Sequence, residues 1–290
     1  MTHNRISPIF PTSKSELLSL PYLVAPSPDA GENLLKEGIP AGKINRVGDI
    51  MVDSLLFHLE EAKRSDIFAR LGLLKDQANS ASFISSFSPN TIIPYALLTL
   101  HRPSNGDEPQ FLQKIPTALE EIAPKIPVVF PTHPRTIKQL VLFGLEDKII
   151  SHDFGPEAEL SFPGIHGLDP LGCLDFLSLM ISARFVLTYS GGIQEETTIV
   201  GIPCLTLRDT TERPITITES TNVLVWNDTG DIVKEAFKIL DGKTKKAKIP
   251  AYRDRKIAKR IIKILVEKHV KRTTNLKERY YKQFRENPLR

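Results

Sequence analysis

The sequence predicts an α/β fold with a doubly wound parallel sheet. Short segments that are apolar throughout alternate with segments in which apolar residues recur at helical spacing. Strands that are apolar throughout are typical of parallel sheets covered by helices on both faces, and right-handed crossovers then give a doubly wound domain. Several of the expected strands end in Ser, Thr, His, Arg or Gly. Ligands of such sheets bind beyond the carboxyl ends of the strands, so these polar ends predict a binding site at that edge.

The composition is typical of a globular protein and argues against a nucleic-acid-binding or membrane protein. Of 290 residues, 41% are hydrophobic and 25% are charged, as in a globular protein. The net charge of +4 is modest, so we expect no nucleic-acid partner. No apolar run is long enough to span a membrane, and residues 1–10 do not resemble a signal peptide, so we expect a cytoplasmic protein without a membrane partner. Cys173 and Cys204 lie among apolar residues, and we expect both thiols to be reduced and buried.

The first half of the chain begins with residues rich in Pro and Ser, which include one short apolar piece, "YLVAP". Asp29 is a suitable N-cap for the first helix, and Gly48 marks a turn between a short strand and a helix. The expected elements are a helix at 29–39, a strand and a helix within 43–65, a strand at 92–105, a helix at 109–123 and a strand at 126–136.

The second half repeats the alternation of helix and strand. The expected elements are a helix at 170–183, a strand at 184–192, a helix at 193–201, strands at 202–214 and 221–228, and a helix at 229–242. A basic amphipathic helix follows, and packing on the domain is favoured over binding to nucleic acid or a membrane. Its apolar stripe consists of Ile257, Ile261, Ile262, Leu265 and Val266.

The stretch "YSGGIQEE" (residues 189–196) joins a strand to a helix. Gly191 and Gly192 allow the backbone to approach a ligand closely, and the first turn of a helix offers N–H groups to an anion. Ser190 adds a hydroxyl group, and Glu196 lies farther along the helix, where a carboxylate suits the hydroxyls of a ribose. A tight turn whose carboxylates cap the helix is an equal alternative.

The segment "RDTTERP" (residues 208–214) follows an apolar strand at the same edge. Arg213 suits a bidentate contact with a phosphate, oriented by a neighbouring carboxylate. Arg208 is expected instead to form a structural ion pair with Asp209 or Glu212. We therefore expect Arg213 to bind the ligand.

Two histidines also follow strands. His101 ends a strand beside Arg102, which favours a functional role over the structural role that is usual for a single histidine. His133 lies between Pro131 and Pro134, so we expect a rigid loop and a geometric role for it.

The chain resembles the non-hydrolysing UDP-N-acetylglucosamine 2-epimerases in an ordered set of motifs: "TLHRPSN", "THPRT", "DPLGCLDFLSLM", "SGGIQEE" and "RDTTERPITITESTNVLV". Two earlier stretches, "APSPDAGENLLKEGI" and "RVGDIMVDSLL", fit the same family, and the resemblance covers residues 22–240. It implies a fold of glycosyltransferase-B type, in which two Rossmann-like domains face each other and the C-terminal one binds the sugar nucleotide. One departure is Tyr189, where an Asp is usual and where we expect the side chain to crowd the site.

The resemblance also implies a reaction and the residues that serve it. The family interconverts UDP-N-acetylglucosamine (UDP-GlcNAc) and UDP-N-acetylmannosamine (UDP-ManNAc) by eliminating UDP and adding it back, with no metal or redox cofactor. Phe176 would flank the uracil, Glu196 would hold the ribose, and His101 would lie near the diphosphate and act in catalysis. The implied site residues are His101, Phe176, Ser190, Gly191, Gly192, Glu196 and Arg213.

The resemblance divides the chain into a remnant of the N-terminal domain and hinge (1–28), the nucleotide-sugar-binding domain (29–245) and a basic helical tail (246–290). Most of the N-terminal domain is expected to be absent, so we expect a truncated or split epimerase with weak or no activity alone. The expected partners are UDP-GlcNAc and either a second copy of the chain in a homodimer or a separate N-terminal half. The alternatives are a nucleotide-sugar-binding subunit without activity and a glycosyltransferase of the same fold.

Overall fold

The computed structural model describes residues 18–75, 91–100, 109–132, 136–138, 146–152, 160, 163–225, 228–246 and 248–268. These residues form two compact units. The larger unit comprises the described residues of Ser54–Pro250, and the smaller one combines 18–53 with 251–268.

The larger unit is built on a parallel sheet. In the described part of the chain, seven strands form this sheet in the order β5-β6-β4-β3-β7-β8-β9. The predicted doubly wound α/β class is thereby confirmed. The order of the strands reverses between β3 and β7, which are direct neighbours, so the chain has a topological switch point there. The strands are β3 (Ala96–Thr99), β4 (Val128–Pro131), β5 (Ile150–His152), β6 (Ile165–Leu168), β7 (Phe185–Thr188), β8 (Cys204–Thr206) and β9 (Asn222–Leu224).

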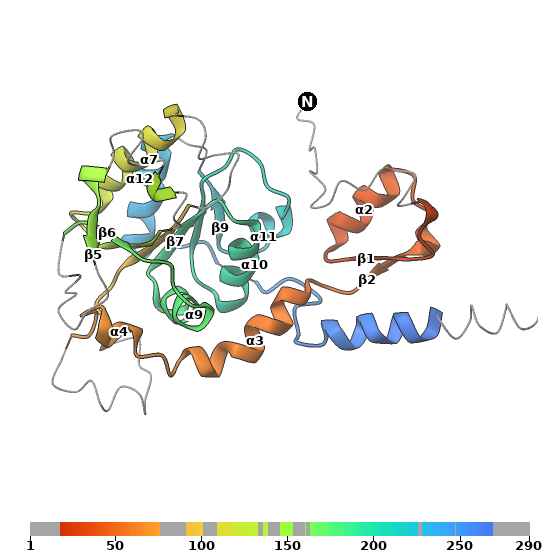
Figure 1. Ribbon diagram of the computed structural model, residues 1–290. Coiled ribbons are helices and arrows are strands. Elements are labelled where there is room, and N and C mark those ends of the chain that lie inside the picture. Colours follow the sequence, from red (N-terminus) through yellow and green to blue (C-terminus); the bar gives the residue numbers. More distant parts are fainter. Residues whose placement is uncertain are drawn as a thin grey trace, which may run out of the picture. The chain divides into compact units, whose positions relative to one another are not determined.

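Helices cover both faces of this sheet (Figure 1). On one face, α7 (Pro109–Ile122) packs against α12 (Thr229–Leu240), and their apolar side chains join strand residues in the main hydrophobic core. Leu98, Phe130 and Leu187 are among those strand residues. On the other face, α9 (Cys173–Ser182) packs beside α10 (Gly191–Val200). Successive strand residues point to opposite faces, which explains why these strands are apolar throughout.

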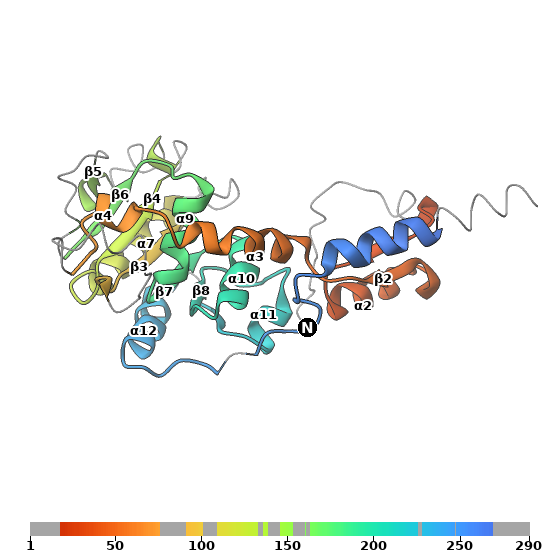
Figure 2. The same cartoon turned by 90° about the horizontal axis from the view of Figure 1, so that it is seen from below.

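The smaller unit contains a two-stranded parallel sheet of β1 (Leu23–Ala25) and β2 (Ile44–Arg46), packed against α2 (Pro28–Lys36) (Figure 2). The short 3₁₀-helix η1 (Ala41–Lys43) leads into β2. Helix α3 (Ile50–Ala62) begins in this unit and continues into the larger one. Near the other end of the described chain, residues 257–268 are helical.

The start of α2 differs from the prediction. Ser27, and not Asp29, is the N-cap, and its hydroxyl accepts a hydrogen bond from the backbone N–H of Ala30 at 3.4 Å. The reason is Pro28, which fits the first helical position because proline has no N–H group to satisfy there. Asp29 then lies in the first turn, where a carboxylate is favourable.

Residues 257–268 are tied to the preceding half of their unit by side chains. The Asp53 carboxylate accepts hydrogen bonds from the backbone N–H groups of Ile257 (3.2 Å) and Ala258 (2.8 Å), and so caps the helix from outside. Arg260 donates from Nε to the carbonyl of Val47 at 2.7 Å. Two distant parts of the sequence thus form one unit through polar contacts as well as packing.

The predicted apolar stripe of this helix is only partly buried. Ile257 is buried and Ile261 is half-buried, but Ile262, Leu265 and Val266 are exposed. The helix therefore packs on its own unit through Ile257 and in part through Ile261, and the rest of the stripe is exposed. Within the described residues, no helix combines the length and the apolar character needed to cross a membrane.

The two cysteines differ in their surroundings. Cys204 lies in β8 and is buried, as predicted, and burial raises the pKa of its thiol to about 12. Cys173 is exposed, so the expectation of a buried thiol is wrong for this residue. It is the first residue of α9, and the buried residues of this helix begin only at Leu177.

Candidate functional site

The site begins at the end of β7, where the chain enters α10. The backbone N–H of Ser190 donates to the hydroxyl of Thr188 at 3.0 Å, and Ser190 is the N-cap of the helix. Its own hydroxyl accepts a hydrogen bond from the N–H of Ile193 at 3.5 Å. Gly191 and Gly192 form the start of the helix, where backbone N–H groups have no carbonyl partner within the helix. This end of α10 therefore carries partial positive charge and suits an anion.

This helix start lies at the topological switch point. Thr99 ends β3 and Thr188 ends the neighbouring β7, and their hydroxyl oxygens are 2.9 Å apart in a hydrogen bond. The chain leaves these two strands in opposite directions across the sheet. In open α/β sheets, the space beyond such a pair of strands is the usual ligand site.

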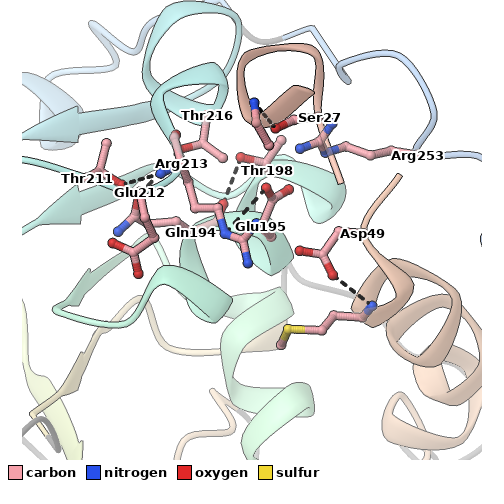
Figure 3. Close-up of polar contacts among 12 residues, drawn as sticks. Ser27, Asp49, Gln194, Glu195, Thr198, Thr211, Glu212, Arg213, Thr216 and Arg253 are labelled. Atoms are coloured by element: carbon pink, nitrogen blue, oxygen red, sulfur yellow. Dashed lines mark hydrogen bonds and ion pairs between the residues drawn. The ribbon is translucent and has the colours of Figure 1, made fainter. Parts of the chain in front are cut away.

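The loop after β8 lies against the same helix (Figure 3). The Nε atom of Arg213 is 4.0 Å from Oε1 of Glu195, which is buried in α10. Glu212 packs on Gly191 so closely that a Cβ atom added there would lie 2.4 Å from its Oε1. The structure thus brings together Arg213 and the serine–glycine turn, which are more than twenty positions apart in the sequence.

Arg208 has the structural role that the sequence indicates. Its Nη1 lies 2.5 Å from Oε2 of Glu212, and both side chains are less than one-fifth exposed. The predicted ion pair is confirmed, with Glu212 rather than Asp209 as the partner. Because Glu212 is engaged in this pair and packs on Gly191, the loop is held close to the first turn of α10.

Two of the residues expected to bind the ligand lie on one side of α10. Gly192 and Glu196 are partly exposed, whereas Ile193, Gln194 and Glu195 between them are buried. A spacing of four residues places side chains on the same face of a helix. Glu196 therefore lies one turn beyond the serine–glycine turn, on the accessible side.

Phe176 lies in the first turn of α9 and is half-buried. The neighbouring Asp175 anchors this turn, since it accepts hydrogen bonds from the hydroxyl of Ser65 (2.6 Å) and from Arg70 (2.5 Å). Since α9 packs against α10, Phe176 belongs to the helix that adjoins the candidate site. His101 and His133 lie outside the described residues.

Tyr189 does not crowd this edge as expected. It is buried in the core that α7 and α12 share with the sheet, and this burial raises the pKa of its phenol. The alternation along β7 explains its direction, because Phe185, Leu187 and Tyr189 all join that core. Among the described residues, no group of three His, Cys, Asp or Glu side chains is arranged to hold a metal ion.

Comparison with known proteins gives a consistent result. A family model described as UDP-N-acetylglucosamine 2-epimerase matches residues 20–266. The UDP-N-acetylglucosamine 2-epimerase of Methanococcus maripaludis is 36% identical over 221 residues, 76% of this chain and 54% of that protein. The corresponding protein of Methanocaldococcus jannaschii is 37% identical over 246 residues, 84% of this chain and 60% of that protein. The chain thus spans little more than half the length of these relatives.

Solved structures agree with the sequence comparison. The M. jannaschii UDP-GlcNAc 2-epimerase in complex with UDP-GlcNAc and UDP has a TM-score of 0.66 at 36% identity, and the match covers 85% of this chain and 61% of that one. The Neisseria meningitidis UDP-GlcNAc 2-epimerase bound to UDP-GlcNAc also has a TM-score of 0.66, at 27% identity, over 87% and 63% of the two chains.

Proposed function

Because this chain belongs to the UDP-N-acetylglucosamine 2-epimerase family, we propose that it binds UDP-GlcNAc and takes part in its interconversion with UDP-ManNAc. The observation that carries the proposal is the meeting of the serine–glycine start of α10 with the Arg213 loop at the carboxyl edge of the sheet. The described residues of this site all lie within the larger unit.

The diphosphate is the group that this edge suits best. Ser190 supplies a hydroxyl, Gly191 and Gly192 supply N–H groups at a helix start, and Arg213 supplies a cation from the next loop. Glycine at these positions lets the backbone approach phosphate oxygens that a side chain would keep away. Charge-assisted hydrogen bonds from Arg213 then offset the negative charge of the ligand.

The nucleoside would extend along the accessible side of the two helices. Glu196 would accept hydrogen bonds from the ribose hydroxyls, and Phe176 would lie against the uracil ring. Support comes from the partial exposure of both residues and from the packing of α9 beside α10. We assign His101 to the neighbourhood of the diphosphate and the reacting sugar on the family resemblance alone.

The same contacts explain how the chain would promote the reaction. In the first step, a general base takes a proton from carbon 2 of the sugar while the bond from carbon 1 to the diphosphate oxygen breaks and its electron pair leaves with UDP, which gives a glycal, UDP and the protonated base. Negative charge develops on the departing diphosphate, so groups that bind it more strongly as the bond breaks lower the barrier. UDP then returns to carbon 1, and a proton is added to the opposite face of carbon 2.

A titration of the full chain with UDP tests the proposal. We expect the wild-type chain to bind UDP and Arg213→Ala to bind it about 10- to 150-fold more weakly, since a hydrogen bond to a charged group contributes about 1.5–3 kcal/mol. The matched control is Arg64→Ala, which removes an exposed arginine two residues beyond the end of α3 and leaves the affinity unchanged. Absence of UDP binding by the wild-type chain would contradict the proposal.

The reaction itself is followed by proton NMR of UDP-GlcNAc incubated with the chain, in which UDP-ManNAc gives separate signals. We also propose a homodimer, as expected from the family, and analytical ultracentrifugation tests it with a predicted mass of twice 32.5 kDa.

A further inference from the structure

Gln194 is a buried amide directly beneath the Arg213 loop (Figure 3). Its Oε1 accepts a hydrogen bond from the hydroxyl of Thr211 at 2.7 Å. Among the residues that the structure describes, its Nε2 has no hydrogen-bond partner. A buried donor without a partner costs about 1–3 kcal/mol, so an apolar side chain of this size would pack here at lower cost. The amide therefore contributes through its Oε1, which is the atom that reaches the loop.

The Thr211 hydroxyl makes a second hydrogen bond, to the backbone of Arg213. The N–H of Arg213 donates to the hydroxyl oxygen of Thr211 at 2.9 Å, and the same hydroxyl donates its proton to Gln194. One threonine hydroxyl thus acts as acceptor and donor in a two-step relay. The relay connects the main chain at Arg213 to the interior of α10.

The backbone carbonyl group of Arg213 is also held by hydrogen bonds. Its oxygen accepts hydrogen bonds from the hydroxyl of Thr216 at 2.7 Å and from the backbone N–H of Thr216 at 3.0 Å. Thr216 is buried, and its hydroxyl lies 3.5 Å from Oε1 of Gln194. Both peptide groups of Arg213 are therefore held, while Glu195, the residue after Gln194, lies beside the guanidinium.

We propose that Gln194, acting through Thr211, is a positioning residue for Arg213, and that this relay fixes the distance between the guanidinium and the anion-binding start of α10. The inference rests on the proposed function, in which both groups bind one diphosphate. A ligand that two separate elements bind together gains affinity when those elements are fixed in advance, since less ordering remains to be done on binding. The relay supplies that ordering, because Gln194 and Ser190 belong to the same helix end.

Matched threonine variants of the full chain test the relay. Thr211→Val keeps the shape and removes the hydroxyl, and we expect UDP to bind about 3- to 10-fold more weakly, as for the loss of one hydrogen bond. Thr211→Ser restores the hydroxyl and is expected to restore the affinity. Thr210→Val is the control, because Thr210 is exposed and its hydroxyl donates to Oδ1 of the neighbouring Asp209 at 3.4 Å, outside the relay.

Two further measurements separate positioning from general damage. Uridine, which lacks the diphosphate, is expected to bind equally to wild type and Thr211→Val in ligand-observed NMR. In the Arg213→Ala background, Thr211→Val is expected to have no further effect on UDP, as residues that act through one another are not additive. Gln194→Met, which removes the amide, is expected to reproduce the Thr211→Val result.

The inference is overturned if Thr211→Val binds UDP like wild type, if it weakens uridine as much as UDP, or if its effect persists in the Arg213→Ala background. Failure of the proposed function has a different signature, since the wild-type chain would then not bind UDP at all.

Discussion

Oε1 of Glu195 lies 4.0 Å from Nε of Arg213, and the Glu195 side chain is only 1% exposed. The next residue of the same helix, Glu196, is partly exposed. Two adjacent carboxylates thus have different surroundings, one inside the protein beside a guanidinium and one at the accessible face. We therefore expect Glu195 to stabilise the fold and Glu196 to bind the ligand.

Substitution of each glutamate by glutamine is predicted to change a different property of the protein, stability for Glu195 and UDP binding for Glu196. Glu195→Gln leaves the largely buried guanidinium of Arg213 without this counter-charge, so we expect the free energy of unfolding to fall by about 1–3 kcal/mol. Glu196→Gln is expected to leave stability unchanged and to weaken UDP binding about 3- to 10-fold, because a neutral amide is a weaker acceptor than a carboxylate. Urea unfolding and UDP titration of both variants measure this. A stability loss in Glu196→Gln but not in Glu195→Gln would contradict the assignment.

Gly48 is predicted to be essential to the smaller unit. Its φ is +98°, and a Cβ atom added there would lie 2.1 Å from the carbonyl oxygen of Tyr252. Gly48→Ala therefore combines a strained backbone with a clash against another main chain, and we expect a loss of at least about 2 kcal/mol. The control is Gly42→Ala in the same unit, where an added Cβ meets nothing within 4 Å.

Limited proteolysis measures this change locally, since loss of the Gly48 contact would release the segment around Tyr252. Faster cleavage in Gly48→Ala than in Gly42→Ala is the expected result. Equal cleavage rates would show that the two segments are not held together at this point.

The two thiols are predicted to react differently. Burial raises the pKa of Cys204 from 9.0 to about 12, so at pH 8 its thiol is protonated as well as inaccessible. A chromogenic thiol reagent is expected to modify one thiol per folded chain, Cys173, and two in guanidinium chloride. Cys173→Ser should abolish the reaction of the folded chain. A reaction of Cys204 in the folded variant would contradict its burial.

The raised pKa of Cys204 also predicts how the stability of the folded chain changes with pH. Between pH 9 and about pH 12 the unfolded chain loses this proton and the folded chain keeps it. The unfolded state is then favoured, so the contribution of Cys204 to stability is complete below pH 9 and is lost as the pH rises through this range.

Much of the fold could be predicted because its strands are buried on both faces. β3, β4, β7, β8 and β9 each lie within a predicted strand, and α7, α9, α10 and α12 within or close to a predicted helix. β5 and β6 were not predicted. β6 reads "IHGL", in which a histidine and a glycine interrupt the apolar pattern, and Gly167 is required there by close packing against Ile149. The short helices α4 (Ile67–Arg70) and α11 (Pro214–Thr218) are set by tertiary contacts.

The candidate site was predictable where local sequence determines it. A serine followed by two glycines after an apolar strand indicates a helix start that suits an anion, and the structure places Ser190 at such a position. The relay from Gln194 to Arg213 has no such local signal. Its contact between Gln194 and Thr211 joins residues 17 positions apart and depends on how β8 lies beside α10. Gln194 is one of several polar residues buried in α10, together with Glu195, Thr197 and Thr198, so its residue type alone does not single it out.

A crystal structure of the chain grown with UDP tests the central claim most directly. The account predicts that the diphosphate lies at the start of α10, with its oxygens about 3 Å from the Ser190 hydroxyl, the backbone N–H groups of Gly191 and Gly192 and the guanidinium of Arg213. A diphosphate bound at another edge of the sheet, or one that contacts neither Ser190 nor Arg213, would contradict it.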